Sequence, residues 1–207
     1  MAEFSLRTWA FIDRMQPQAA AHVAATSPGD VPVAGMAELF IEVAPGNEVF
    51  RVADIALKAA DVRPALQIVE REFGLLEIHS AQQAAVLAAG DAVLSHLGLT
   101  EADRIRPKVA SAQFITNVSP YQAQLLNKWR KGSLLIPGES LFILEVAPAA
   151  YVSLAANEAE KAANIKIVEN RAVGRFGRMF ISGSESEVKA ASQAAIAALE
   201  QLPGRDG

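Results

Sequence analysis

The chain of 207 residues contains an internal repeat. When it is aligned with itself at an offset of about 103 residues, identical or similar residues recur along both halves almost without gaps. A match of this extent indicates two copies of one domain, and its period is too long for a solenoid unit. The matching stretches are FID at 11–13 with FIT at 114–116, FIEVAP at 40–45 with ILEVAP at 143–148, ADIALKAADV at 53–62 with ANEAEKAANI at 156–165, and Phe-Gly at 73–74 with Phe-Gly at 176–177.

The repeat places a first domain at residues 1–99, a linker at 100–108 and a second domain at 109–207. The sequence around the join, GLTEADRIRPK at 98–108, is polar and contains a proline, as is typical of a connection between domains. We therefore expect two units with the same internal order of elements.

Each copy shows the same pattern of strands and helices. Alternation of apolar and polar residues predicts strands, and apolar residues on one stripe predict helices. The order strand–helix–strand–helix–strand–strand–helix indicates an α/β sandwich, in which helices pack on a largely antiparallel sheet. In the first copy the expected strands are 5–13, 38–44, 62–69 and 73–80, and the expected helices are 17–25, 46–61 and 81–97.

Composition limits the classes of function. Hydrophobic residues make up 51% of the chain and the net charge is −4, so a packed core is expected and disorder is not. The mild acidity gives no reason to expect nucleic acid or an anionic membrane as a partner. Cysteine is absent, which excludes disulfides and thiolate metal sites. Neither a signal-peptide pattern nor an apolar run of about 20 residues occurs, so we expect a soluble cytoplasmic protein.

One turn between two expected strands carries three consecutive charges. In QIVEREFGLLEIH, at 67–79, the residues Glu70, Arg71 and Glu72 separate two apolar segments. Such a turn is usually no more than a solvated tip. The second copy has Val173-Gly174-Arg175 at the same place, so the fold itself does not require these charges.

Motifs for catalysis or metal binding are weak. The three histidines, His22, His79 and His96, are isolated and none recurs in the second copy. No spacing typical of metal ligands is present, and Ser140 in PGESLF does not match the nucleophile elbow. The glycine-rich basic loop at 174–178 does not open a helix, which argues against a phosphate cradle but leaves room for a small anion. We predict no catalytic residues, no metal and no cofactor.

The repeated helix carries a family resemblance. ADIALKAADV and ANEAEKAANI resemble the signature helix of bacterial microcompartment shell domains. The strand that ends the standard domain lies at the front of each copy, in SLRTWAFID and VASAQFITN, as in the circularly permuted variant. Two permuted copies in one chain resemble the tandem, trimer-forming shell proteins. Together with WAFIDRMQPQAA and LIPGESLFILEVAP, the resemblance is greatest to the carboxysome members with a gated pore, and it covers residues 4–202.

The resemblance implies an assembly and a function. Such chains form homotrimers whose six domains make a pseudohexagonal tile in a compartment shell, beside hexameric and pentameric shell proteins, and two trimers can stack. A Glu-Arg pair in the first domain gates the pore, and Glu70 and Arg71 match it. The implied cargo is anionic, with ribulose bisphosphate entering and 3-phosphoglycerate leaving. Lys58 and Lys161 match the lysine at the tile edge, although each would otherwise be an ordinary solvated helix lysine.

Two alternatives remain open at the level of the sequence. The first is a shell tile of a different microcompartment, such as one that processes aldehydes. The second is a pair of small metabolite-binding or signalling domains that dimerises around a ligand cleft. The roles of Arg175 and Arg178 and the type of carboxysome, α or β, also stay open.

Overall fold

The computed structural model describes residues 3–207 and divides the chain into two compact units. The first comprises the chain up to Pro107 together with Leu202–Gly207, and the second is Lys108–Gln201. Each unit holds one four-stranded antiparallel sheet, with the order β1-β2-β4-β3 in the first and β5-β6-β8-β7 in the second. The expected α/β architecture of two similar antiparallel domains is therefore confirmed.

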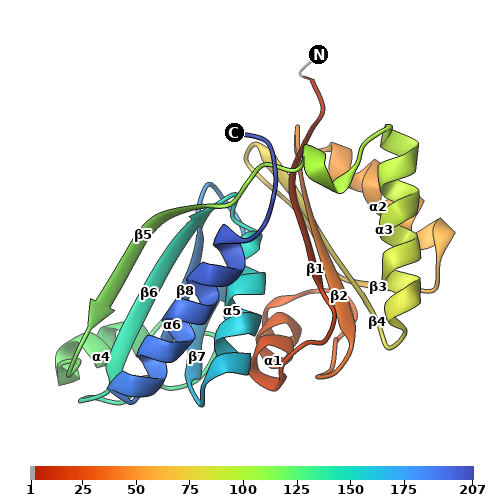
Figure 1. Ribbon diagram of the computed structural model, residues 1–207. Coiled ribbons are helices and arrows are strands. Elements are labelled where there is room, and N and C mark those ends of the chain that lie inside the picture. Colours follow the sequence, from red (N-terminus) through yellow and green to blue (C-terminus); the bar gives the residue numbers. More distant parts are fainter. Residues whose placement is uncertain (1–2) are drawn as a thin grey trace. The chain divides into compact units, whose positions relative to one another are not determined.

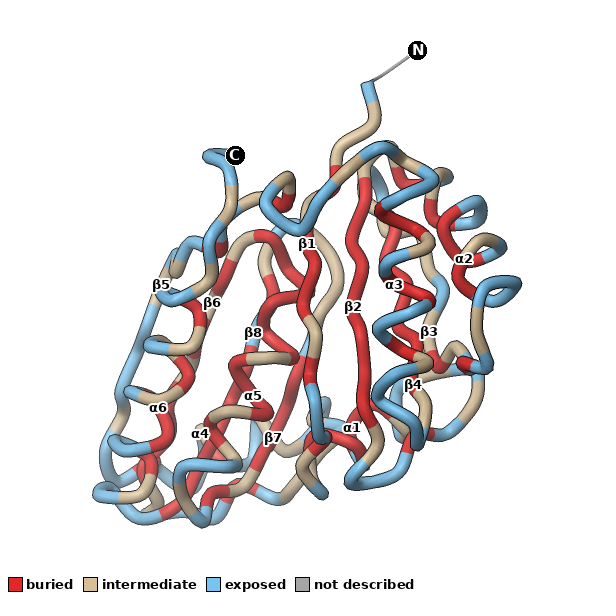
Figure 2. Tube along the Cα trace, turned by 45° about the vertical axis from the view of Figure 1, so that its right-hand side comes forward, coloured by how far each residue is buried: buried red, intermediate tan, exposed pale blue. Residues whose placement is uncertain are grey.

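The first unit has the order of elements that the sequence predicts. Helices α2 and α3 lie side by side on one face of its sheet (Figure 1). The strand β2 is central and buried along most of its length (Figure 2). The elements are β1 (Ser5–Ile12), α1 (Pro17–Thr26), β2 (Ala37–Ala44), α2 (Glu48–Ala59), β3 (Arg63–Glu70), β4 (Phe73–Ser80) and α3 (Gln83–Leu97).

The second unit repeats this order, and the local irregularities recur with it. A bulge in β1 at Arg7 matches one in β5 at Ala110, and a bulge in β3 at Ala65 matches one in β7 at Val168. Such recurrence indicates that the bulges belong to the domain fold. The elements are β5 (Lys108–Ile115), α4 (Pro120–Asn127), β6 (Ser140–Ala147), α5 (Tyr151–Ala162), β7 (Lys166–Arg171), β8 (Gly177–Gly183) and α6 (Glu185–Glu200).

The core of the first unit lies between its sheet and the helices α2 and α3. Alternate residues of β2 and β4 point into it, and the apolar stripe of α2 covers them, because strands have a period of two residues and helices one of 3.6. Burying each such side chain contributes about 1.5–3 kcal/mol. The core includes Leu39, Ile41 and Val43 of β2, Leu76 and Ile78 of β4, Val49, Val52, Ala53 and Ala56 of α2, and Val86, Ala89 and Val93 of α3.

A glycine allows the sheet to approach the start of α2 very closely. A Cβ atom on Gly74, in β4, would lie 2.2 Å from the carbonyl oxygen of Gly46 and 2.7 Å from Cβ of Val49. Gly177 has the same role in the second unit, where a Cβ would lie 2.0 Å from the carbonyl oxygen of Ala149. The Phe-Gly pair therefore recurs in both copies because this backbone contact leaves no space for a side chain.

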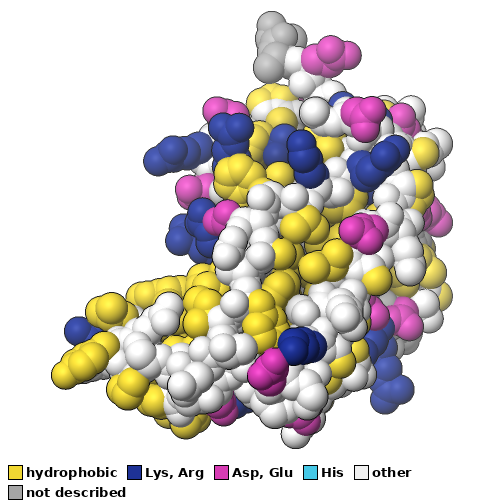
Figure 3. Space-filling model, turned by 60° about the vertical axis from the view of Figure 1, so that its left-hand side comes forward, with side chains coloured by type: hydrophobic (Ala, Val, Ile, Leu, Met, Phe, Trp, Pro, Cys, Tyr) yellow, Lys and Arg dark blue, Asp and Glu magenta, His cyan; other side chains and the backbone are white. Residues whose placement is uncertain are grey.

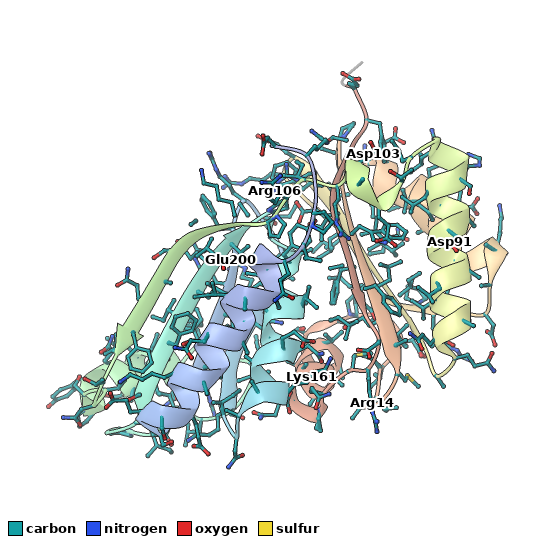
Figure 4. All side chains as sticks on the ribbon, viewed as in Figure 1. Arg14, Asp91, Asp103, Arg106, Lys161 and Glu200 are labelled. Atoms are coloured by element: carbon teal, nitrogen blue, oxygen red, sulfur yellow. The ribbon has the colours of Figure 1, made fainter. Side chains whose placement is uncertain are left out.

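The segment between the repeats pairs with the C-terminal tail inside the first unit. This segment begins with a short 3₁₀ helix, η1 (Glu101–Asp103). Asp103 ends the helix and Arg106 follows it (Figure 4). The buried Arg104 donates from Nη1 to the carbonyl of Trp9 (3.0 Å) and from Nε to that of Pro203 (2.8 Å). The predicted linker is thus an ordered part of the first unit, fastened by a buried guanidinium.

Substitution of Gly74 should test the close contact at α2. Gly74→Ala should lower the free energy of unfolding by about 1–3 kcal/mol, because the added methyl group overlaps backbone that cannot move aside. Gly174→Ala provides a comparison: a Cβ there would have no atom within 4 Å, so its cost is only that of its positive φ of 96°, about 1–2 kcal/mol. Chemical denaturation measures both, and an unchanged free energy of unfolding in Gly74→Ala would contradict the account.

Candidate functional site

The charged turn, defined as residues 70–72, closes the β3–β4 hairpin. Glu70 pairs with Phe73 in the antiparallel register, so Arg71 and Glu72 form a two-residue connection. Arg71 has a φ of +54°, in the left-handed region that residues other than glycine seldom adopt. The structure confirms the turn that the sequence predicts. It also shows that an arginine occupies the turn position with a positive φ.

The second unit closes the equivalent hairpin differently. Strand β7 ends at Arg171 and β8 begins at Gly177, so the connection is longer. The residue that aligns with Arg71 is Gly174, and its φ is +96°. The two copies therefore share a positive φ at this place, and only the second meets it with the residue that adopts it at no steric cost. This aligned glycine was visible in the sequence and could have revealed the constraint on Arg71.

The side chains of the charged turn are available to move. Arg71 and Glu72 are exposed and Glu70 is partly exposed. Within residues 3–207, the side chains of Glu70 and Arg71 form no hydrogen bond and no ion pair. The backbone beneath them is fixed, because a Cβ on Gly46 would lie 2.7 Å from Cγ1 of Val69 and 3.1 Å from the backbone of Phe73. A rigid hairpin tip thus presents mobile charges.

An arginine from β1 supports the base of the charged turn. The guanidinium carbon of Arg7 lies 3.5 Å from the ring centroid of Phe73, and its Nε is 2.6 Å from Oε1 of Glu42. Such a cation–π contact contributes about 0.5–2 kcal/mol. The second unit instead pairs Arg178 of β8 with Glu145, the counterpart of Glu42. This gives Arg178 a structural contact that the sequence did not predict.

The two predicted edge lysines lie at the same position, in the last turn of α2 and of α5. Lys58 is 75% exposed and its Nζ lies 2.7 Å from Oδ2 of Asp54. Lys161, labelled at the end of α5 in Figure 4, is 33% exposed and lies 2.8 Å from Oε1 of Glu158. The structure thus brings Lys58 and Lys161 to equivalent helix ends, where a cation also suits the helix dipole.

The sequence did not reveal a buried polar group in the first unit. We call it the carboxyl–imidazole cluster, and it consists of the buried Glu38, Glu77 and His79 together with Asp30, whose side chain is 42% exposed. The backbone N–H of Ala65 donates to Oε2 of Glu77 (2.7 Å), and Nδ1 of His79 lies 3.0 Å from Oε1 of Glu77. On its other side, Nε2 of His79 lies 3.3 Å from Oδ2 of Asp30. Because the members are far apart in the sequence, no local motif marked them.

The cluster shifts the ionisation of two of its members. Burial, the charge of Glu77 and a hydrogen bond with Glu77 together raise the pKa of Glu38 well above its usual value. Burial by itself would lower the pKa of His79, but hydrogen bonds and charges from Glu77 and Asp30 outweigh it, and the pKa is raised. Both shifts favour the protonated form, which is neutral for Glu38 and positively charged for His79.

Two further features of the described chain bear on metal binding and catalysis. Residues 3–207 contain no group of three or more His, Asp or Glu residues able to hold a metal ion. Ser140 lines a shallow cavity of about 550 Å³ beside Glu139 and Ser184, with no histidine among the lining residues. None of the helices in residues 3–207 is long and apolar enough to cross a bilayer.

Exposed hydrophobic side chains gather on parts of the surface, as seen in the lower left of Figure 3. Tyr121 and Leu125, one turn apart on α4, are 81% and 61% exposed. In the first unit, Phe50 of α2 is 53% exposed, whereas its counterpart in α5, Ser153, is 4% exposed. Patches of this kind often mark interaction surfaces.

Comparison with known proteins shows the family of both halves. The CsoS1D N-terminal domain matches residues 6–103 and again 109–203. The carboxysome shell protein CcmP of Synechococcus elongatus is 51% identical over 97% of this chain and 94% of its own length. The carboxysome shell protein CsoS1D of Hydrogenovibrio crunogenus is 48% identical over 97% of this chain and 98% of its own.

Solved structures agree with this assignment. A fused permuted hexameric shell protein from the RMM microcompartment is 45% identical, with a TM-score of 0.94 over 98% of this chain and all of its own. A double ringed trimeric shell protein from the same microcompartment is 36% identical, with a TM-score of 0.95 over 99% of this chain and all of its own. The predicted relationship to shell proteins rather than to enzymes is confirmed, and the chain belongs to the CsoS1D N-terminal domain family of tandem, permuted microcompartment shell proteins.

Proposed function

We propose that this chain is a carboxysome shell tile, a homotrimer whose six domains surround a pore gated by Glu70 and Arg71. The curated relatives support the carboxysome, since both proteins described above are named as its shell proteins. The observation that carries the gate is the positive φ of Arg71 at the place where the second unit has Gly174. An arginine kept in a backbone conformation that costs about 1–2 kcal/mol suggests a use for its side chain.

The exposed apolar side chains support assembly with further copies. Tyr121 and Leu125 on α4 and Phe50 on α2 are the kind of large side chains that interfaces bury. Strand β5 is also exposed at most positions, whereas its counterpart β1 is largely buried. Surfaces of the first and second units would meet in a closed ring of copies, which buries them without leaving an open end.

The charged turn suits a gate when three copies meet on an axis. Three exposed arginines around an opening focus a positive potential that attracts phosphorylated anions, with ribulose bisphosphate and 3-phosphoglycerate as the proposed cargo. Three glutamates would repel one another unless each pairs with an arginine. Because Glu70 and Arg71 have no partner within residues 3–207, two arrangements that differ by a few kcal/mol are accessible to them.

The helix-end lysines are proposed to lie at the tile edge. Lys58 is exposed, and its one ion pair within residues 3–207 is with Asp54 on its own helix, a surface pair that contributes about 0.3–0.5 kcal/mol. Its ammonium group can therefore exchange this partner for carbonyl groups of a neighbouring tile while its stem packs against that tile. The proposed neighbours are hexameric and pentameric shell proteins, and a second trimer stacked on the first is a further proposed partner, as the double ringed relative suggests.

A second candidate is a tile of a different microcompartment. The two solved structures described above come from the RMM microcompartment, so similar shell proteins are not confined to carboxysomes. Genes for rubisco and carbonic anhydrase beside the gene for this chain would favour the carboxysome, and genes for aldehyde-processing enzymes would favour the alternative.

The oligomeric state provides the first test. Native mass spectrometry should give a mass three or six times that of the 22.0 kDa chain, because a trimer or a stacked pair of trimers is expected. Charging the exposed stripe of α4 with Tyr121→Glu and Leu125→Glu should shift the population toward monomer without loss of helical circular dichroism. A wild-type protein that is monomeric or dimeric at micromolar concentration would exclude the tile.

The gate is tested by giving the first turn the glycine of the second. Arg71→Gly should leave the trimer intact, keep the free energy of unfolding within about 1 kcal/mol or raise it, and leave the pore open. Electron cryo-microscopy of the variant reads the pore, and chemical denaturation reads stability. Glu72→Ala, on the neighbouring exposed residue, is the control. An axis that still closes in Arg71→Gly would refute the assignment of the gate.

The edge role is tested by charge reversal. Lys58→Glu should reduce the assembly of trimers into sheets while the trimers stay folded, because the reversed charge faces carbonyl oxygens and lies at the negative end of α2. Negative-stain microscopy compares sheet formation with that of Arg51→Glu, a matched reversal of an exposed residue on the same helix. Equal sheet formation by wild type and Lys58→Glu would remove the proposed role.

A further inference from the structure

The carboxyl–imidazole cluster lies at the base of the β3–β4 hairpin, the end opposite to the charged turn. His79 is paired with Arg63 where the hairpin opens, whereas Phe73 is paired with Glu70 where it closes. Four segments meet at this base: β2, β4, the start of β3 and the loop at 27–36. The cluster therefore ties the loop at 27–36 to three strands of the sheet.

The loop at 27–36 is fastened to β3 at the same place. The backbone N–H of Gly29 donates to the carbonyl of Ala65, and that of Asp30 to the carbonyl of Pro64, both at 2.9 Å. A Cβ on Gly29 would lie 2.3 Å from the carbonyl oxygen of Pro64, so the two backbones touch. The side chain of Asp30 also contacts His79, so the imidazole connects the loop at 27–36 to β4.

The second unit has no such group. At the positions of Asp30, Glu38, Glu77 and His79 it carries Ser133, Leu141, Phe180 and Ser182. Leu141 and Phe180 belong to an apolar cluster, and Trp129 packs edge-on against Phe180 with ring centroids 5.2 Å apart. The domain fold is thus compatible with an apolar filling here. A cluster of ionisable side chains at this place in only one of the two copies requires a reason other than folding, because such buried groups contribute little net stability.

We propose that the carboxyl–imidazole cluster is a pH-sensitive switch that holds the base of the β3–β4 hairpin and the loop at 27–36 while it is protonated, and releases them as the pH rises. One buried atom of the cluster is unsatisfied: Oε1 of Glu38 has no hydrogen-bond partner within residues 3–207. Deprotonation of His79 would leave the buried carboxylate of Glu77 without its positive neighbour.

The direction follows from the two shifts in pKa. The pKa of His79 is raised in the folded chain, so its contribution to stability is complete below the ordinary pKa of about 6.5 and is lost as the pH rises through the folded value. The pKa of Glu38 is raised as well, so the folded chain also binds this proton more tightly than the unfolded chain. Both groups therefore make the first unit less stable as the pH increases.

Other charged groups lie on the elements that pack around the cluster. Nη1 of Arg63 lies 3.5 Å from Oδ1 of Asp30 and keeps its charge at all relevant pH values. The remaining groups are His22 on α1, Asp13 and Arg14 after β1, and Glu42 on β2 with its partner Arg7. His22 is the histidine among these, so it is tested separately. In the second unit, Glu169 accepts from the N–H of Lys131 (2.6 Å), and that unit contains no histidine.

The switch would act on the hairpin that carries Glu70 and Arg71. This consequence for the pore rests on the proposed function, whereas the switch itself does not. A looser base would widen the range of positions open to the hairpin tip, so pH would bias the gate. The experiment below measures the hairpin directly, and its outcome is independent of whether a pore exists.

Hydrogen exchange of the intact assembly between about pH 6 and pH 9 tests the switch. Protection factors, which remove the pH dependence of intrinsic exchange, should fall with pH for the amides of β3, β4 and 27–36 but not for those of β7 and β8. The variant Glu38→Leu, Glu77→Phe, His79→Ser installs the residues of the second unit and should lose this pH dependence. His22→Leu and His96→Gln are the matched controls and should keep it.

Two results would overturn the proposal. The first is a parallel change of protection in both hairpins, or an unchanged pH dependence in the triple variant. The second does not depend on any variant folding: in a magnetic resonance titration of the wild-type protein, an apparent pKa of His79 at or below that of His96 would show that the imidazole is not held charged.

Discussion

The hairpin that carries the charged turn depends on one contact between backbones. Gly74 of β4 meets the chain just before α2, where Gly46 in turn lies against Val69 and Phe73. Because no side chain fits between these segments, the hairpin packs directly against the start of the helix near its tip. The same contact in the second unit, at Gly177, shows that it belongs to the domain fold. The contact at Gly74 supports the backbone next to the charged turn, and a gate requires such support beneath its side chains.

The two copies of the domain share this backbone contact but differ in the residues at both ends of the hairpin. The first copy has an arginine at a positive φ in the turn and a buried carboxyl–imidazole cluster at the base of the same hairpin. The second has Gly174 in the turn and an apolar cluster around Phe180 at the base. Both polar features therefore occur on one hairpin of one copy. Duplication provides an internal reference here, because each departure from the second copy marks a position where folding alone does not explain the residue.

Much of the fold could be predicted from the sequence because each strand and helix is encoded in both copies of the repeat. Strands and helices of both copies appear in the predicted order, and the family followed from the helix at 53–62 and its repeat. The positions of Glu70, Arg71, Lys58 and Lys161 followed from alignment of the copies, while their proposed roles came from the resemblance. The cluster of Asp30, Glu77 and His79 could not be predicted, because its members come from distant segments and meet only through strand register. The cation–π contact of Arg7 with Phe73 was hidden for the same reason.

The central claim is that three copies of the charged turn surround the axis of a trimer. A structure of the assembled protein at near-atomic resolution tests it most directly. The account predicts that Glu70 and Arg71 of each copy line a central opening, with the arginines directed into it in one state and paired with glutamates in the other. A trimer with these residues at its perimeter, or a protein that forms no ring, would contradict it.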